Sequence, residues 1–167
     1  MPSWTKVYKY DPIKPLLSSG NQQVAYYTNR DLLDNSVGPV QVLWDLKIPV
    51  QILRKQQADG SWKYPSKKPW HTTDYDQLET YRQLGFLIKM FGFNKSHPSI
   101  DMAAEYFFLK QSVEDDFRGI YANQYSPNYT AAIAELLILA GYENDPRIIK
   151  VFDWLLKIRQ DDGGWAL

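Results

Sequence analysis

A six-residue stretch that occurs twice constrains the fold of this chain more than any other feature. QADGSW at residues 57–62 recurs as QDDGGW at residues 160–165, 103 positions later (160 minus 57). That distance fits two repeats of the roughly 40 to 50 residues typical of helical arrays. The shared positions are Gln57, Asp59, Gly60 and Trp62 in the first copy and Gln160, Asp162, Gly163 and Trp165 in the second. The chain is therefore expected to be a tandem helical repeat.

A weaker third copy is expected between the other two. A helical pattern ends at Gln111, which lies 54 positions after the first motif glutamine (111 minus 57) and 49 before the last (160 minus 111). Gly119, followed by Ile120 and Tyr121, is taken as the counterpart of the Gly-x-Trp of the strong copies. Residues 112–118 between them are interpreted as an insertion, and their acidic run VEDD as a solvated turn.

Two kinds of helical pattern alternate along the repeats. Amphipathic segments are expected near residues 49–56, 98–108 and 146–159, and segments apolar on most sides near 76–91 and 129–140. Helices that are apolar all round belong inside, and amphipathic helices cover them. The predicted fold is therefore all-α, with helical hairpins stacked as in an α/α toroid and forming an open arc of about three hairpins.

Single residues mark the expected ends of these helices. Gly92 and Gly141 would end the two apolar helices in the left-handed conformation, because glycine lacks the Cβ that disfavours it. Pro98 and Pro146 would begin the amphipathic helices that follow, since proline is tolerated in the first turn. A further helix is expected over residues 40–47, where Pro49 either kinks it or begins a new one.

The predicted organisation has two parts. Residues 1–38 are expected to form an irregular arm with one helix near 24–33, and residues 39–167 the helical repeats. The repeats are expected to be incomplete at the C-terminus, because Leu167 follows the last motif at once and no polar capping repeat is visible. A second chain or further repeats would then cover the open end.

Composition excludes several classes of function. Nineteen basic and nineteen acidic residues leave no net charge, which argues against nucleic acid as a partner. Zero cysteines and two histidines exclude disulfides, thiolate nucleophiles and cysteine-ligated zinc, so no metal or other cofactor is expected. No run reaches the roughly 20 apolar residues of a membrane span, and the N-terminus lacks the apolar core of a signal peptide. A cytoplasmic protein is expected.

The two strong motifs resemble the QW repeats of the terpenoid cyclase and protein prenyltransferase superfamily, which includes the squalene-hopene cyclases. The resemblance covers about residues 40–167 and extends to the segments 129–142, 145–147 and 154–155 around the motifs. It is closest to the bacterial and archaeal members of unassigned activity. It implies a repeat domain with an apolar cavity lined by aromatic residues, which would bind an isoprenoid or another apolar small molecule.

The resemblance also suggests catalytic residues. Class II cyclases of this superfamily carry an Asp-x-Asp-Asp motif at the head of an inner helix, and this chain has DYDQ at residues 74–77. The match would make Asp76 the proton donor and Asp74 its neighbour, near the aromatic or imidazole side chains of Trp70, His71, Tyr75 and Tyr81. The residues themselves also allow a simpler reading, in which both aspartates favour the helix start. With so few hairpins the chain alone is expected to be inert.

Two other classes of function remain open at this point. Some α/α toroids act on polysaccharides, and such sites need exposed aromatic rings that stack on sugars beside acidic groups. The loops at residues 62–71 and 119–129 carry such a mixture and should neighbour each other, with Trp70, Tyr121, Tyr125 and Tyr129 as candidate contacts. In the third class the chain is a non-catalytic scaffold, and its concave layer or one end binds another protein.

Overall fold

The computed structural model describes residues 7, 9–68 and 70–165 of the chain. Over these residues the chain is helical and has no strand, which confirms the predicted all-α class. The seven α-helices are α1 (Ile13–Leu17), α2 (Gln22–Tyr27), α3 (Lys47–Leu53), α4 (Tyr75–Phe91), α5 (Pro98–Leu109), α6 (Pro127–Leu137) and α7 (Pro146–Lys157). A 3-10 turn, Val40–Leu43, precedes α3, and π-turns extend α2 (Thr28–Leu32) and α6 (Ile138–Tyr142).

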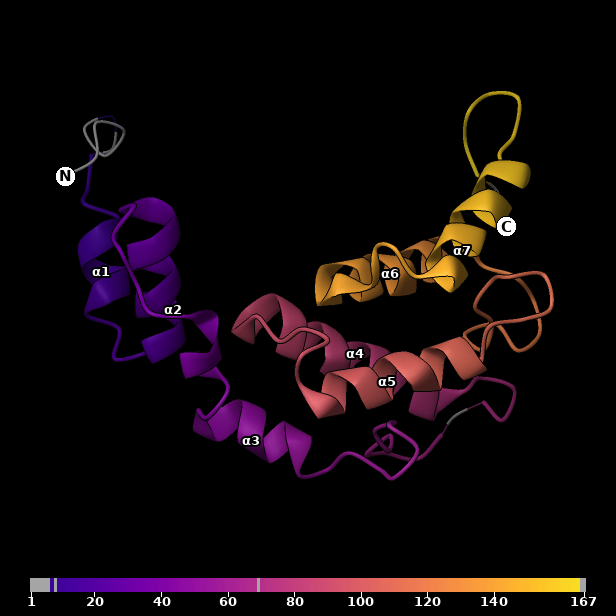
Figure 1. The fold of residues 1–167 in the computed structure, drawn as a ribbon, viewed down its shortest axis with the longest axis horizontal. Helices are drawn as coiled ribbons and strands as arrows, with labels where there is room; N and C mark the ends of the chain where they lie inside the picture. Colours follow the sequence, from indigo (N-terminus) through magenta and orange to yellow (C-terminus); the bar gives the residue numbers. More distant parts are fainter. Residues whose placement is uncertain (1–6, 8, 69, 166–167) are drawn as a thin grey trace.

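The helices follow one another along an arc, with α1 and α2 at one end and α6 and α7 at the other (Figure 1). The two apolar helices, α4 and α6, pack against each other. Helix α4 also contacts α3 and α5, and α6 contacts α7. Helices α4 and α6 thus form a central pair, with α3, α5 and α7 beside them. The predicted contrast between apolar and amphipathic helices holds for α7 but not for α5, which buries Ile100, Ala103, Ala104, Tyr106, Phe107 and Phe108.

The core lies where α4, α5, α6 and α7 meet. Leu84 and Leu87 of α4, Phe107 of α5 and Leu137 of α6 are fully buried there. Each such side chain contributes roughly 1.5–3 kcal/mol through the apolar surface it removes from water. Gly85 lets α6 approach α4 closely, since a Cβ at that position would already lie 3.3 Å from the side chain of Leu136.

The helix ends predicted at Gly92, Pro98 and Pro146 are confirmed. The end predicted at Gly141 is displaced, because α6 ends at Leu137 and Gly141, with φ 100°, lies within the π-turn that follows. Gly92 ends α4 with φ 64°, and the amide of Phe93 donates to the carbonyl of Leu87 at 3.3 Å, as in a Schellman motif. Asp145 caps the first turn of α7 by accepting from the amide of Arg147 at 2.9 Å. Pro98 and Pro146 begin α5 and α7 as expected.

The N-terminal part differs from the expectation in detail. The predicted arm contains two short helices, α1 and α2, and the helix expected near 24–33 corresponds to α2 with its π-turn. Residues 1–6 and 8 of that arm lie outside the described residues. The helix predicted over 40–47 is wrong, because a 3-10 turn occupies Val40–Leu43 and α3 begins only at Lys47. Pro49 is the third residue of α3, where a backbone N–H would have no helical partner.

Candidate functional site

The first motif closes a tight turn at the end of α3, here called loop 1 (residues 56–62). The amide of Gln57 donates to the carbonyl of Ser61 at 2.8 Å, and the amide of Gly60 donates to the carbonyl of Gln57 at 3.0 Å. The indole Nε1 of Trp62 donates to the carbonyl of Ile52 in α3 at 2.8 Å. The indole therefore fastens the loop to the helix that precedes it.

The last motif, loop 3 (residues 159–165), forms the same turn at the end of α7. The amide of Gln160 donates to the carbonyl of Gly164 at 2.9 Å. The indole Nε1 of Trp165 donates to the carbonyl of Leu155 at 2.7 Å, ten positions earlier, as in loop 1. Gly60 and Gly163 have nearly the same φ, 88° and 89°. The prediction that the two motif copies are structurally equivalent is confirmed.

The third copy exists, but its predicted alignment is wrong. In loop 2 (residues 111–117) the amide of Ser112 donates to the carbonyl of Asp116 at 2.8 Å. Asp115 has φ 73° and takes the position of the motif glycine, while Phe117 takes that of the tryptophan. Gly119 lies outside the turn. Aspartate tolerates the left-handed conformation better than most residues, so this turn does not need a glycine.

The acidic run in loop 2 is therefore part of the repeat and not an inserted solvated turn. The side chain of Asp116 is fully buried, and its carboxylate pairs with the guanidinium of Arg118 at 3.0 Å. The hydroxyl of Ser112 also donates to this carboxylate. In loop 2 a serine, two acids and a phenylalanine replace the four shared motif letters, which explains why the sequence pattern missed it.

One glutamine in each of the first two loops ties the loop to the following outer helix. Gln56 Nε2 donates to the carbonyls of Gly60 at 2.9 Å and Ser99 in α5 at 2.8 Å. Gln111 Nε2 makes the corresponding bonds to Asp115 and to Arg147 in α7, both at 3.1 Å. Gln111 is thus the counterpart of Gln56, not of Gln57. Sequence reasoning missed this role, although a glutamine four residues before the left-handed position marks both loops.

Buried threonines of the inner helices hold the same two loops from the other side. The amide of Trp62 donates to Thr80 Oγ1 at 2.9 Å, and the amide of Phe117 donates to Thr130 Oγ1 at 3.1 Å. Thr80 and Thr130 are fully buried and lie 50 positions apart (130 minus 80). Sequence reasoning missed both threonines. They hold loop 1 against α4 and loop 2 against α6.

Asp74, a candidate catalytic residue, is the N-cap of α4. One carboxylate oxygen accepts from the amide of Gln77 at 2.9 Å, and the other pairs with Lys110 Nζ at 2.7 Å. The amide of Asp74 donates to the carbonyl of Gly119 at 2.8 Å. The capping role considered from the sequence accounts for this carboxylate.

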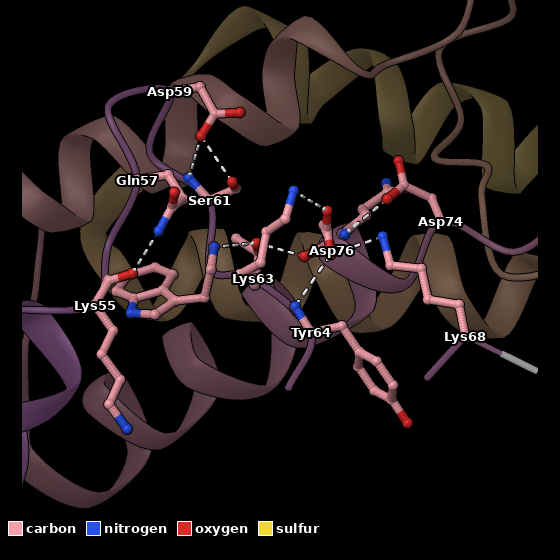
Figure 2. A network of polar contacts seen from close by, with 12 residues as sticks. Lys55, Gln57, Asp59, Ser61, Lys63, Tyr64, Lys68, Asp74 and Asp76 are labelled. Carbon is pink, nitrogen blue, oxygen red and sulfur yellow. Dashed lines mark hydrogen bonds and ion pairs between the residues drawn. The ribbon is translucent and has the colours of Figure 1, made fainter. Parts of the chain in front are cut away.

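Asp76, the candidate proton donor, lies among hydrogen-bond donors (Figure 2). Its carboxylate accepts from the amide of Tyr64 at 3.0 Å and pairs with Lys68 at 3.0 Å and Lys63 at 3.2 Å. Burial alone would raise the pKa of Asp76, but the Tyr64 amide and the two ammonium groups outweigh it and lower the pKa to about 2. Asp76 is therefore ionised at neutral pH, whereas an acid catalyst for an alkene must hold its proton.

A polar pocket of about 580 Å³ lies beside these carboxylates. Its lining combines acidic, basic and amide side chains with one tyrosine: Gln57, Asp59, Ser61, Lys63, Asp74, Asp76, Tyr106 and Lys110, with Ala58. Burial, reinforced by Asp74 and Asp59, raises the pKa of Tyr106. Within the described residues no cluster of three or more histidine, aspartate or glutamate side chains could hold a metal ion. Because charged and amide side chains make up most of its lining, the pocket is polar, unlike the apolar cavity that the resemblance implies.

The predicted aromatic contacts fall into two sets. Tyr75, Tyr81 and Tyr129 lie within the packed molecule. Tyr75 packs on Tyr64 with ring centroids 4.8 Å apart, and Tyr81 on Tyr129 at 6.1 Å. In the second set Trp70, His71 and Tyr121 are exposed, and Tyr125 is half-exposed with its ring edge against Trp154.

The second aromatic loop begins against Thr73 and Asp74, which directly follow the first aromatic loop. The amide of Asp74 binds the carbonyl of Gly119, and Thr73 Oγ1 donates to the carbonyl of Ile120 at 3.3 Å. A Cβ at Gly119 would overlap the side chain of Gln77 in α4, so the second loop depends on a glycine at this close approach.

Comparison of the sequence with models of protein families and with curated proteins gives no match. Among the helices of the described residues, none combines the length and the apolar character needed to cross a bilayer. The function is therefore argued from the geometry of the chain itself.

Proposed function

We propose that this chain is a non-catalytic helical-repeat module, with the architecture of the terpenoid cyclase and prenyltransferase superfamily, that binds other helices at the ends of its array. The observation that carries the proposal is that the equivalent tryptophans of loops 1 and 3 are buried to very different extents. Trp62 is 2% exposed, whereas Trp165, which makes the same hydrogen bond in the same turn, is 47% exposed. In the part of the chain that the structure describes, no hairpin covers loop 3 in the way that the following hairpin covers loop 1.

Helix α7 supports the proposal with an uncovered apolar stripe. Ile149, Phe152 and Leu156 lie on one side of the helix and are 52%, 45% and 64% exposed. Forty-eight positions earlier in α5 (152 minus 104), Ala104 and Phe108 take the places of Phe152 and Leu156. Both are buried.

The cover over α5 comes from the following hairpin. The guanidinium of Arg147 lies 3.6 Å from the ring centroid of Phe108, and the ring of Tyr142 packs on Phe108 at 5.8 Å. The Tyr142 hydroxyl donates to Asp101 at 2.6 Å. The stripe on α7 is therefore the part of the repeat that another helical hairpin would cover.

The state of the carboxylates supports a binding role over catalysis. The pKa of Asp76 is about 2, and Asp74 is engaged by a helix amide and a lysine. Asp76 is therefore not disposed to donate a proton to an alkene or epoxide, and Asp74 serves as the N-cap of α4.

The first half of the test is an activity assay on the full chain. Incubation with squalene and with farnesyl diphosphate is expected to give no product, for both the wild type and Asp76→Asn. Turnover that Asp76→Asn abolishes would overturn the proposal in favour of a cyclase.

The second half measures the uncovered apolar surface with the dye bis-ANS at low protein concentration. Phe152→Glu is expected to reduce dye fluorescence at least twofold, since it places a charge in the middle of the exposed stripe. Leu109→Glu is the matched control, because Leu109 is 84% exposed and lies outside the stripe. Equal fluorescence from all three proteins would show that the stripe binds nothing apolar and would refute the proposed role.

A further inference from the structure

Helix α5 is capped by a histidine. His97 precedes Pro98 with φ −94° and ψ 125°, the extended backbone of an N-cap residue. Its Nδ1 atom accepts a hydrogen bond from the amide of Ser99 at 3.2 Å. At the start of α7 the carboxylate of Asp145 accepts the equivalent bond, from the amide two positions on. An imidazole therefore has at α5 the role that a carboxylate has at α7.

This hydrogen bond requires a neutral imidazole. A ring nitrogen that accepts from an amide N–H carries no hydrogen, so the proton of the His97 ring lies on Nε2. Protonation of Nδ1 would set two N–H groups against each other and leave the amide of Ser99 without this partner. It would also place a positive charge at a helix N-terminus, which the macrodipole disfavours. The cap therefore exists only while His97 is uncharged.

The imidazole belongs to an aromatic cluster that joins three segments of the chain. Its ring lies edge-on to Trp44, with centroids 5.4 Å apart, and edge-on to Phe93 at 5.0 Å. Trp44 and Phe93 stack on each other at 4.8 Å. Trp44 follows the 3-10 turn Val40–Leu43, Phe93 follows α4, and His97 begins α5. Burial in this cluster disfavours the charged imidazole and lowers the pKa of His97 below its ordinary value of 6.5.

Few charged groups of these segments oppose that shift. Residues 40–46 and 92–101 contain three charged side chains, Asp45, Lys95 and Asp101. Asp45 raises the pKa of His97 through its negative charge, but by less than burial lowers it. Lys95 and Asp101 are hydrogen-bonded to residues 141–142, at the end of α6. The surroundings therefore favour the neutral, capping form of the imidazole.

The capped turn of α5 also receives loop 1. Ser99, whose amide donates to His97, offers its carbonyl to Gln56 Nε2 at 2.8 Å. The first turn of α5 is thus held by the imidazole through an amide and holds loop 1 through a carbonyl of the same residue. Loss of the cap would loosen the turn to which loop 1 is tied.

We propose that His97 is a pH-sensitive helix cap, which joins residues 40–46 and loop 1 to the start of α5 while it is neutral and weakens this junction when mild acid protonates it. The inference is independent of the proposed binding function. Because the folded pKa of His97 is lowered, the unfolded chain binds the proton more tightly than the folded chain does. Its contribution to stability is therefore complete above about pH 6.5 and is lost as the pH falls from there through the folded pKa. Histidine is the side chain whose ordinary titration falls in this range.

The two histidines of the chain provide a variant and a matched control. His97→Asn keeps a side chain that caps helices well but does not titrate, and His71→Asn removes the exposed histidine. Between about pH 7.5 and 5, the equilibrium constant for unfolding in urea should rise about threefold or more for the wild type and His71→Asn, and much less for His97→Asn. The same rise in His97→Asn as in the wild type would overturn the proposal.

NMR of the wild-type chain observes the hydrogen bond itself and does not depend on the folding of a variant. The imidazole of His97 should titrate with a midpoint below 6.5. The amide proton of Ser99 should move upfield with the same midpoint, because it loses its acceptor. A Ser99 amide that does not follow the imidazole, or a His97 midpoint above 6.5, would overturn the pH-sensitive cap.

Discussion

Loop 1 and loop 3 have the same backbone turn and different surroundings. In both, an indole Nε1 donates to a carbonyl ten positions earlier, yet Trp62 is buried and Trp165 is half-exposed. Gly60 packs against the backbone of Met102 in α5, while Gly163 meets only the flexible side chain of Arg159. The comparison shows that the motif itself specifies the turn, and that the next hairpin supplies most of the burial.

The largest expected difference concerns the two tryptophans. Trp62→Ala should lower the free energy of unfolding by about 3–5 kcal/mol, because it empties a buried site. Trp165→Ala should cost roughly 1 kcal/mol or less, since much of that side chain already meets water. Urea denaturation of the two variants measures both. Equal costs would show that burial by the next hairpin is not what distinguishes the loops.

The two glycines sharpen the same comparison. An alanine at either position pays roughly 1–2 kcal/mol for the left-handed conformation. At Gly60 the new Cβ would also overlap the backbone oxygen of Met102, whereas at Gly163 it would lie 2.9 Å from the movable guanidinium of Arg159. Gly60→Ala should therefore cost about 3 kcal/mol or more and Gly163→Ala about 1–2. Thermal unfolding of the pair gives the difference, and similar melting temperatures would contradict the packing of loop 1 on α5.

The lowered pKa of Asp76, in the first hairpin, predicts that the stability of the fold depends on pH. Its folded pKa of about 2 lies below the ordinary value of 3.8, so the carboxylate stabilises the fold above about pH 4. This contribution is lost as the pH falls from about 4 through about 2. It amounts to at most about 2 kcal/mol, reduced by the exposure of the paired lysines.

The variant Asp76→Asn tests this prediction, because it removes the titrating group and leaves the N-cap of α4, Asp74, in place. In Asp76→Asn, stability measured between pH 5 and 2 should fall less steeply than in the wild type. An unchanged slope would mean that the lysine pairs do not form in solution.

A smaller effect is expected from the link between loop 2 and α7. Gln111→Ala removes the bonds to Asp115 and Arg147 and should cost about 1–2 kcal/mol. Gln57 is the matched control, because its exposed amide reaches only the carbonyl of Lys55, and Gln57→Ala should stay within about 0.5 kcal/mol. Chemical denaturation compares them. A larger loss from Gln57→Ala would reverse the assignment of the two glutamines.

The sequence predicted the parts of the fold that depend on local chemistry. Glycine and proline marked the ends of α4, α5 and α7, and the repeated letters located two of the three turns. The middle turn was misaligned because Asp115 and Phe117 perform the roles of glycine and tryptophan without matching them. The geometry of a turn, in contrast to its sequence, becomes visible only in the folded chain.

The site was less predictable than the fold. Two aspartates at a helix start fit both a catalytic and a capping role, and the choice depends on distant groups. Lys110 lies 36 positions from Asp74, and Tyr64 lies 12 positions before Asp76. No local pattern indicates these contacts, so the depressed pKa of Asp76 could not be foreseen from its neighbours in the chain.

The central claim is that loops 1 and 3 form the same turn and differ in how far the rest of the molecule buries them. The indole N–H groups test this claim most directly. Amide and indole resonances from nitrogen-15 NMR would report hydrogen bonding through chemical shift and cover through exchange with solvent. Both Trp62 and Trp165 should show the chemical shifts of hydrogen-bonded indoles, and solvent exchange should be at least a hundredfold slower at Trp62. Different chemical shifts for the two indole N–H groups, or equal rates of exchange with solvent, would contradict the claim.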